Sequence, residues 1–416
     1  MRLSLPQVYR LINAVAPNGQ QPQSARSHPF LLAIAYLGFI SLGLPDTLIG
    51  VAWPSVRDTF QLPQSAVALV FIGGGISYFL SSFFTGRLLN SLGIGALLAC
   101  SSALVALSGF GYSMAPVWAI FAACSLFHGL GSGAIDAGLN HYVAHHFSAR
   151  HMNWLHACYS VGATLGPLTM TAVIAWHGSW RIGYLIIACT LFVLAALFVA
   201  TRRRWDEPGT PDNAPETVAS MSLGAVLRHS VVWVQAALFF VYTGLESSMG
   251  QWSYTILTEA RQVPREIAGL WVTTYWGSIA AGRILFGFVV DLIGVDRLLR
   301  WSTITVCIGT GLFAWNLSPT ISGISIAIVG LGLAPIYPCM MTRTPQRLGK
   351  AMAAHAIGLQ VSTAMLGVAV LPSLCGVLAQ RFGVETVAVA TIGMALAVTL
   401  LHESLLARQQ TGSAQL

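Results

Sequence analysis

The segment GRLLNSLG at residues 86–93 recurs as GFVVDLIG at residues 287–294, 201 positions later. Each copy follows a long apolar run, begins and ends with glycine and carries one polar residue at its fifth position. Such a match indicates two related halves in which equivalent helices end in equivalent loops. We expect structural or gating roles for the paired positions, which are Gly86, Asn90 and Gly93 in the first copy and Gly287, Asp291 and Gly294 in the second.

Two further matches extend the repeat outward from these segments. The tripeptide GLG at 129–131 recurs at 330–332, again 201 residues on, and GATLGP at 162–167 is echoed by GVAVLP at 367–372, 205 residues on. A nearly constant offset over three matches predicts two halves that run in the same direction. This is the pattern of transporters whose halves are related by an axis along the membrane normal.

The composition and the apolar runs predict a membrane protein. The chain has 416 residues, of which 55% are hydrophobic and only 8% are charged, whereas soluble domains carry about 25% charged residues. Runs long enough to cross a bilayer must be helical, because every backbone amide in lipid needs an internal partner. The twelve predicted spans are 30–55, 66–88, 94–113, 117–143, 151–175, 180–200, 231–257, 267–291, 297–317, 319–342, 352–378 and 384–405.

We therefore predict an all-α membrane protein of twelve transmembrane helices in two six-helix bundles. A polar stretch with RRR at 202–204 and DEPG at 206–209 separates the bundles. The expected divisions are a cytoplasmic N-terminal tail at 1–28, a first bundle at 29–200, a cytoplasmic linker at 201–230, a second bundle at 231–405 and a cytoplasmic C-terminal tail at 406–416.

The basic residues predict the orientation. Fifteen of the 21 lysines and arginines fall on the side of the N-terminus, five fall opposite and Arg283 lies within a span. Positive residues gather on the cytoplasmic side of membrane proteins. We expect a multi-pass protein of the bacterial inner membrane with both termini cytoplasmic. The formal net charge of +7 reflects this loop bias, so we expect lipid and no nucleic acid as a partner.

The sequence gives no sign of an enzyme, a metal site or a cofactor. The seven cysteines are scattered singly and form no CxxC pair, so we interpret them as small buried residues. No HExxH motif, no GxxxxGK[ST] motif and no nucleophile–base–orienter set is present. We expect no catalytic residue, a gradient rather than ATP as the energy source, and a monomer.

Two acidic residues in the first half are candidates for proton coupling. Each costs about 2.5–3.5 kcal/mol at the bilayer centre, so it needs a partner or an aqueous path. Asp46 follows Pro45, which can break the helix; the alternative is a carboxylate bound by freed backbone groups. Asp136 lies on one helix face with His128 and Asn140; the alternative is a pair with Arg283 or His156.

The second half carries a charged pair of candidates. Glu246 lies on one face with Gln235 and Tyr242, 200 residues after Asp46, so we expect the two acids on opposite walls of one central space. Arg283 is a candidate counter-charge for a carboxylate or an anionic substrate, or a side chain that extends to the membrane surface. The full set of candidate substrate contacts is Asn140, His156, Tyr159, Gln235, Tyr242, Glu246, Trp252, Trp276, Tyr337 and Gln360.

These motifs resemble the major facilitator superfamily, and more narrowly its fucose permease-like branch. The glycine-bounded loops are similar to the superfamily's cytoplasmic loop motif, although Asn90 replaces its acidic residue. PDTLI at 45–49, GAIDAGLN at 133–140 and GLAPIYP at 332–338 resemble the branch. The resemblance implies that Asp46 and Asp136 couple sugar uptake to protons.

We therefore expect a secondary transporter that moves a small sugar-like solute by proton-coupled alternating access of its two halves. Three alternatives remain open at this stage. A proton-coupled exporter of amphipathic compounds fits the lack of amide side chains in the first span. A non-transporting membrane sensor or receptor would bind without flux, and a membrane enzyme would need a catalytic set that we do not find.

Overall fold

The computed structural model of the chain describes residues 29–147, 149–205 and 223–413. The predicted N-terminal tail (1–28), the middle of the predicted linker (206–222) and the last residues of the predicted C-terminal tail (414–416) lie outside these ranges. Over the described residues, twelve helical segments are long and apolar enough to cross a membrane. The predicted fold class and number of spans are confirmed.

The first half forms six spans, of which the first two contain a second short helix. The bounds are α2 (Pro29–Asp46) with α3 (Leu48–Phe60), η1 (Gln64–Val67) with α4 (Ala68–Leu92), α5 (Ile94–Met114), α6 (Trp118–His146), α7 (Ala149–Ala175) and α8 (Trp180–Trp205). Most helices run several residues past the predicted spans, because an apolar pattern marks the lipid-buried stretch and not the turns beyond it.

The second half repeats this arrangement after a one-turn helix, α9 (Leu223–Val226). Its spans are α10 (Ser230–Thr255) with η2 (Ile256–Ala260), α11 (Arg265–Ile293), α12 (Val295–Trp315), α13 (Pro319–Leu333) with α14 (Ile336–Leu348), α15 (Lys350–Phe382) and α16 (Glu385–Ser413). The segment η2 is a π-helical turn, which the sequence pattern did not predict.

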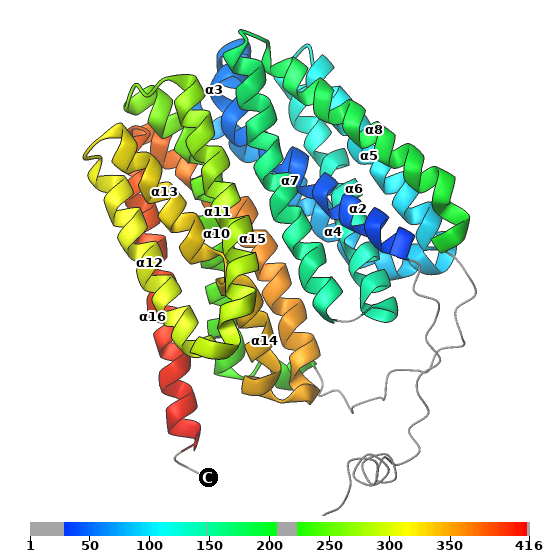
Figure 1. Ribbon diagram of the computed structural model, residues 1–416, viewed down its shortest axis with the longest axis vertical. Coiled ribbons are helices and arrows are strands. Elements are labelled where there is room, and N and C mark those ends of the chain that lie inside the picture. The colour runs from blue at the N-terminus through cyan, green and yellow to red at the C-terminus, as the bar shows by residue number, and fades with distance from the viewer. Residues whose placement is uncertain (1–28, 148, 206–222, 414–416) are drawn as a thin grey trace, which may run out of the picture.

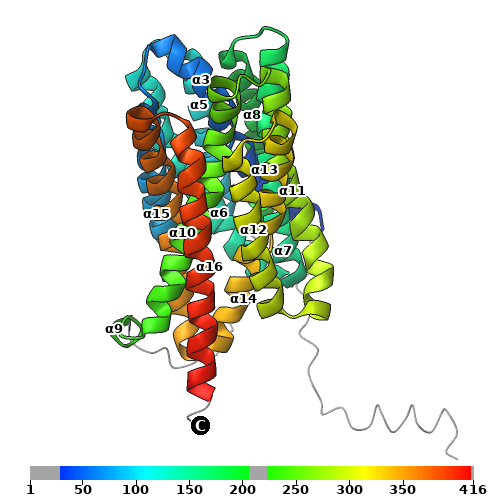
Figure 2. The same cartoon turned by 90° about the vertical axis from the view of Figure 1, so that its left-hand side faces the viewer.

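The two halves lie side by side as separate bundles (Figure 1). Because the number of spans is even, α2 begins and α16 ends on the same side of the bilayer, which we call the tail side; the opposite side is the far side. In Figure 1 the ribbons of the two bundles meet at the far side and diverge toward the tail side. Figure 2 shows α16 running along one face of the second bundle, with α9 at the tail side.

Close contacts at glycine confirm that the halves are structural repeats. A Cβ at Gly131 in α6 would meet Val105 and the carbonyl oxygen of Ser101 in α5. The equivalent Gly332 in α13 makes the same approach to α12, where it would meet Val306 and the carbonyl oxygen of Ser302, each exactly one repeat later. Small residues let membrane helices pack closely when no hydrophobic force drives them together. The repeated glycines therefore fix equivalent helix pairs in both halves.

The first span breaks where the sequence predicts. Helix α2 ends at Asp46, Thr47 forms a turn and α3 begins at Leu48. The Thr47 hydroxyl donates to the carbonyl oxygen of Ala163 in α7 at 3.0 Å. Pro45 has no N–H to donate to the helix, and the contact with α7 stabilises the interruption. The break places the Asp46 carboxylate midway along the span.

Contacts between the halves extend from the far side to the middle of the membrane. A Cβ at Gly269 of α11 would meet Thr171 of α7, and Gly277 lies nearer the middle with Thr164 of α7 3.6 Å from its Cβ position. Beyond this level the tail-side part of α11 is exposed, as Phe288 shows. The closest contacts between α7 and α11 thus lie on the far side and near the middle of the spans, and the ribbons of the two halves diverge toward the tail side (Figure 1).

Candidate functional site

Five ionisable side chains lie midway along the spans where the two halves face each other. We call Asp46, His128, Asp136, Glu246 and Arg283 the central polar group. They come from α2, α6, α10 and α11. Charged groups inside a membrane protein are costly and need partners or water, so the contacts of each member indicate what the group can do.

The Asp46 carboxylate is bound by side chains from two other helices. His128 Nε2 on α6 lies 2.8 Å from one carboxylate oxygen, and the Tyr159 hydroxyl on α7 donates to the other at 3.0 Å. The alternative, in which freed backbone groups bind the Asp46 carboxylate, does not agree with these contacts. The sequence placed Tyr159 among the site candidates but did not pair His128 with Asp46.

Asp136 is the second acid of the first half. The Tyr78 hydroxyl on α4 donates to it at 2.8 Å, and the Asn140 amide, one turn along the same helix, donates at 2.9 Å. The alternatives that paired Asp136 with Arg283 or His156 do not describe this structure. Both of its partners are uncharged, so the carboxylate has no adjacent counter-ion among them.

Glu246 has a charged partner in its own half. Tyr242 donates a hydrogen bond to its carboxylate, and Arg283 Nη2 lies 3.7 Å from the other oxygen. Arg283 also reaches the first half, where it donates to the Ser160 hydroxyl of α7 at 2.6 Å. The guanidinium is therefore a polar link between the halves at the level of the central acids.

The central polar group remains accessible although it lies midway along the spans. The exposed fraction of the side chain is 30% for Asp46 and 15% for His128, and it is 14% for Glu246 and 17% for Arg283. Asp136 is also partly exposed. These values show that the group is not sealed between the helices.

The predicted substrate contacts divide by burial. Asn140, Tyr159 and Tyr337 are partly exposed and His156 is exposed, with its ring edge-on to Phe39 at 5.4 Å between centroids. Their roles as substrate contacts stay predictions, and each of the four keeps exposed surface that such a role requires.

The other predicted contacts are buried between helices. Trp252 is completely buried and donates to the carbonyl oxygen of Pro372. Gln360 donates to Gln235 at 2.8 Å, with both side chains buried. Tyr242 and Trp276 are also buried. Their roles as substrate contacts stay predictions, and the structure gives each of them a packing contact as well.

The glycine-bounded loops have the predicted equivalent geometry. Gly93 and Gly294 end α4 and α11 with φ values of 75° and 85°, a left-handed conformation that favours glycine. Gly86 and Gly287 have open space at the Cβ position. Asn90 and Asp291 are both exposed, so the gating role predicted for these positions stays a prediction.

A charged cluster at the tail side of the second half was not predicted. Arg343 of α14 binds the Asp296 carboxylate of α12 through two nitrogens, and Arg347 Nη2 lies 3.6 Å from the same carboxylate. Arg300 pairs with Glu403 of α16. The i, i+4 spacing of Arg343 and Arg347 was the available signal.

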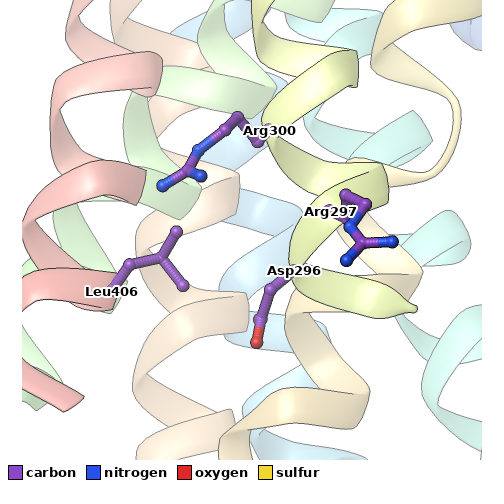
Figure 3. A pocket seen from close by; sticks show the side chains of 4 residues that line it. All are labelled: Asp296, Arg297, Arg300 and Leu406. Atoms are coloured by element: carbon purple, nitrogen blue, oxygen red, sulfur yellow. The ribbon is translucent and has the colours of Figure 1, made fainter. Parts of the chain in front are cut away.

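A pocket of about 250 Å³ lies beside this cluster, between α12 and α16. Figure 3 shows Arg300 extending toward α16, which contributes Leu406, whereas Arg297 points to the other side of α12. Within the described residues no group of three or more His, Cys, Asp or Glu side chains could hold a metal ion.

Polar contacts also join the halves at the far side. Arg57 of α3 lies 3.0 Å from the Glu259 carboxylate in the π-helical turn, and the Gln64 amide donates to the same carboxylate at 2.8 Å. The backbone N–H of Gln64 donates to Gln380 of α15 at 2.7 Å. We call these four residues the far-side latch; the sequence alone did not bring them together.

Comparison with known sequences finds relatives over most of the chain. The profile of the Major Facilitator Superfamily matches residues 35–262 and 237–415. The glucose/mannose transporter GlcP of Bacillus subtilis is 23% identical, covering 82% of this chain and 86% of its own length. A glucose/galactose transporter of Brucella abortus is 22% identical, covering 89% and 92%. Bypass of stop codon protein 6 of Saccharomyces cerevisiae is 23% identical, covering 92% and 85%.

Solved structures with a similar fold include a bacterial homologue of the lysosomal transporter Spinster, in an inward-facing and unoccupied conformation. It superposes with a TM-score of 0.76 at 12% identity, covering 93% of this chain and 98% of its own. A variant of the nucleoside transporter NupG gives a TM-score of 0.75 at 12% identity, covering 90% and 99%. At such low identity these likenesses show the fold alone.

Proposed function

The chain belongs to the major facilitator superfamily, and from that premise we propose that it carries a small sugar-like solute across the membrane by alternating access coupled to protons. It is a multi-pass membrane transporter and not an enzyme. Relatives described as glucose/mannose and glucose/galactose transporters support a polyhydroxylated solute.

The observation that carries the proposal is the accessible central polar group. Asp46 and Glu246 keep 30% and 14% of their side-chain surface exposed midway along their spans. The halves are latched at the far side by Arg57 and Glu259, and their ribbons diverge toward the tail side (Figure 1). A rigid-body rocking of the halves would close the tail side and open the far side around the same residues.

Proton coupling is assigned to the two acids of the first half. A carboxylate in low-dielectric surroundings is costly as an anion. Binding a proton to Asp136 removes a charge whose described partners, Tyr78 and Asn140, are uncharged. We propose that this neutralisation allows the halves to close around the solute, and that loss of the proton on the other side favours reopening.

The orientation follows from the distribution of basic residues. Arg202, Arg203 and Arg204 end α8 at the tail side, and the charged cluster around Arg343 and Arg347 lies there too. Positive residues mark the cytoplasmic side. We propose that the tail side is cytoplasmic, that the membrane is the bacterial inner membrane and that the working unit is a monomer.

The test uses purified full-length protein in proteoliposomes. A thermal-shift screen against sugars, glycosides, nucleosides and organic acids identifies a stabilising solute, and radiolabelled solute then reports net accumulation under an imposed proton gradient. Asp136→Asn should abolish accumulation and retain exchange of internal for external solute, because exchange needs no net proton movement. Glu266→Gln, which changes an exposed acid at the start of α11, outside the central polar group and the glycine-bounded loops, is the control.

Three results of the same assay would contradict parts of this proposal. Normal accumulation by Asp136→Asn would reject its coupling role. Binding without flux in any vesicle orientation would support the sensor or receptor alternative. Flux only from the tail side to the far side would make the protein an exporter.

A further inference from the structure

We propose that Asp46 and His128 form one proton-binding pair, and that Glu246, the equivalent acid of the second half, pairs instead with a permanent cation, Arg283. The inference deepens the proposed function and rests on it, because it says where a coupled proton would be held. His128 is thus part of the coupling site, a role that neither the surrounding sequence nor the resemblance to a family indicated.

The geometry places one shared proton between the two side chains. His128 Nε2 and the Asp46 carboxylate oxygen are 2.8 Å apart, the distance of a charge-assisted hydrogen bond. Both side chains are partly exposed, so protons can reach them. Without an added proton the pair carries one negative charge, as carboxylate and neutral imidazole. With one added proton it is neutral, as carboxylate and imidazolium.

Within the described residues Asp46 has no ion pair with a lysine or arginine; its ionic contact is His128, and Arg283 reaches only as far as Ser160, next to Tyr159 on α7. The titratable groups that face the pair from packed helices are Tyr159 of α7, which donates to Asp46; Tyr112 of α5, with its ring 6.5 Å from the His128 ring; and Tyr78 of α4, which binds Asp136 of α6. Tyr184 of α8 packs on Tyr112 at 5.1 Å between ring centroids. The Asp46–His128 pair, like Asp136, can therefore alternate between a charged and a neutral state.

The second half lacks this capacity at the equivalent position. Glu246 lies 200 residues after Asp46, and its ionic partner is Arg283 at 3.7 Å. A guanidinium stays protonated in proteins, so this pair is neutral at any physiological pH without taking up a proton. The first half thus holds a pair that can take up a proton, Asp46 with His128. The second half holds a pair whose charge does not change, Glu246 with Arg283, which we call the constant pair.

The remaining contact of His128 fits a proton-carrying role. Its Nδ1 is buried and has no hydrogen-bond partner within the described part of the chain, so the bond from Nε2–H to Asp46 sets the tautomer of the neutral imidazole, and the added proton of the imidazolium is the one on Nδ1. A purely structural histidine normally has both ring nitrogens bound. The imidazole can therefore gain or lose a proton while its contact with Asp46 is kept.

The experiment measures proton binding directly and needs no solute, so its failure is separate from failure of the proposed transport activity. Full-length protein labelled with 15N-histidine is reconstituted in lipid bilayers, and the imidazole nitrogens are followed by solid-state NMR from pH 4 to pH 9. His128→Gln identifies the His128 signal among the eleven histidines by its loss. Asp46→Asn should lower the proton affinity of His128 at least tenfold, because it removes the carboxylate that stabilises imidazolium.

Two further measurements make the result decisive. Glu246→Gln, the equivalent change in the second half, should alter the proton affinity of His128 less than about twofold. In wild type that also carries 13C-labelled aspartate, with Asp46→Asn to assign the signal, the Asp46 carboxyl carbon and the His128 nitrogens should change at the same pH, since they share one proton. An unchanged His128 titration in Asp46→Asn, or separate transitions of the two side chains in the wild type, would overturn the proposal.

Discussion

Asp46 and Glu246 occupy equivalent positions in two copies of one fold, yet their partners differ in kind. Asp46 faces a histidine and a tyrosine from neighbouring helices, whereas Glu246 faces an arginine. Equivalent glycines keep the helix contacts of the two halves nearly identical. The comparison shows that the helix packing is repeated in the two halves but the partners of the central acids are not. Each half can therefore have a separate role at one central site.

The tail side shows the same contrast. In the second half, Asp296 and Arg343 bind each other across α12 and α14, and their counterparts one repeat earlier are Gly95 and Tyr142. Gly95 instead packs directly against the backbone of Arg202 in α8. At this position an ion pair joins the helices of the second bundle, whereas a close backbone contact joins those of the first. We therefore expect loss of a side chain to change the stability of the two halves differently.

The largest expected effect tests the symmetric part of the comparison. Gly162→Val and Gly367→Val should each destabilise the protein by about 3 kcal/mol or more, since a Cβ at either position would collide with a backbone carbonyl oxygen, that of Ile40 or of Phe240. Thermal unfolding in detergent measures the change. Gly358→Val is the control in the same helix as Gly367, because the space at its Cβ position is open. Tolerance of one change but not the other would show that the scaffold repeat is only approximate.

The next effect concerns the constant pair. Arg283→Gln should lower the rate of solute transport about 10- to 100-fold, because it leaves Glu246 without its counter-ion and weakens the contact with Ser160, and hydrogen bonds to charged groups contribute about 1.5–3 kcal/mol. Initial uptake rates in proteoliposomes measure it. Arg297→Gln, which changes an exposed arginine of the next helix, should leave the rate within about twofold. Equal losses in both variants would remove the special role of the pair.

A smaller effect concerns the latch that joins the halves. Glu259→Gln should favour opening of the far side by about tenfold in population, because it removes the charge that Arg57 and Gln64 bind across the interface. Distances between spin labels on far-side ends of the two halves report the populations. Asp58→Asn is the matched control, since Asp58 also pairs with Arg57 but lies in the same half. A larger shift for Asp58→Asn would contradict the latch.

The smallest effect is at the tail side. Arg343→Gln should cost about 1 kcal/mol of stability, because the ion pair with Asp296 is partly exposed and partly screened by water. The equivalent change in the first half, Tyr142→Phe, should cost less, since the buried ring keeps its stacked contact with His146 and its edge-on contact with Trp205. Unfolding midpoints in detergent compare the two. A greater loss from Tyr142→Phe would reverse the contrast between the halves.

The sequence predicted the parts of the fold that depend on chain-local patterns. Spanning length followed from the apolar runs, the repeat from the glycine spacing and the break at Thr47 from Pro45. These features follow from backbone hydrogen bonding in lipid and from glycine geometry, which act over a few residues. The π-helical turn that carries Glu259 has no such local signature and was missed.

The candidate site was predicted less completely, for a different reason. Polar residues within apolar spans were identified correctly as unusual, but a single sequence does not tell which face of a helix meets another helix and which meets open space. His128 is 82 residues from Asp46 in the chain, so only the fold reveals their contact. Conversely, Trp252 and Gln235 fitted the pattern of lining residues, and both are buried where α10 packs against its neighbours.

The most direct test of the account is proton movement measured together with solute movement. A pH-sensitive dye inside proteoliposomes reports proton entry when the solute found by the thermal-shift screen is added to wild type, Asp46→Asn or Glu246→Gln. We predict that Asp46→Asn exchanges solute without moving protons and that Glu246→Gln moves protons with whatever solute it still carries. Proton entry through Asp46→Asn at the wild-type ratio, with none through Glu246→Gln, would contradict the division of tasks between the halves.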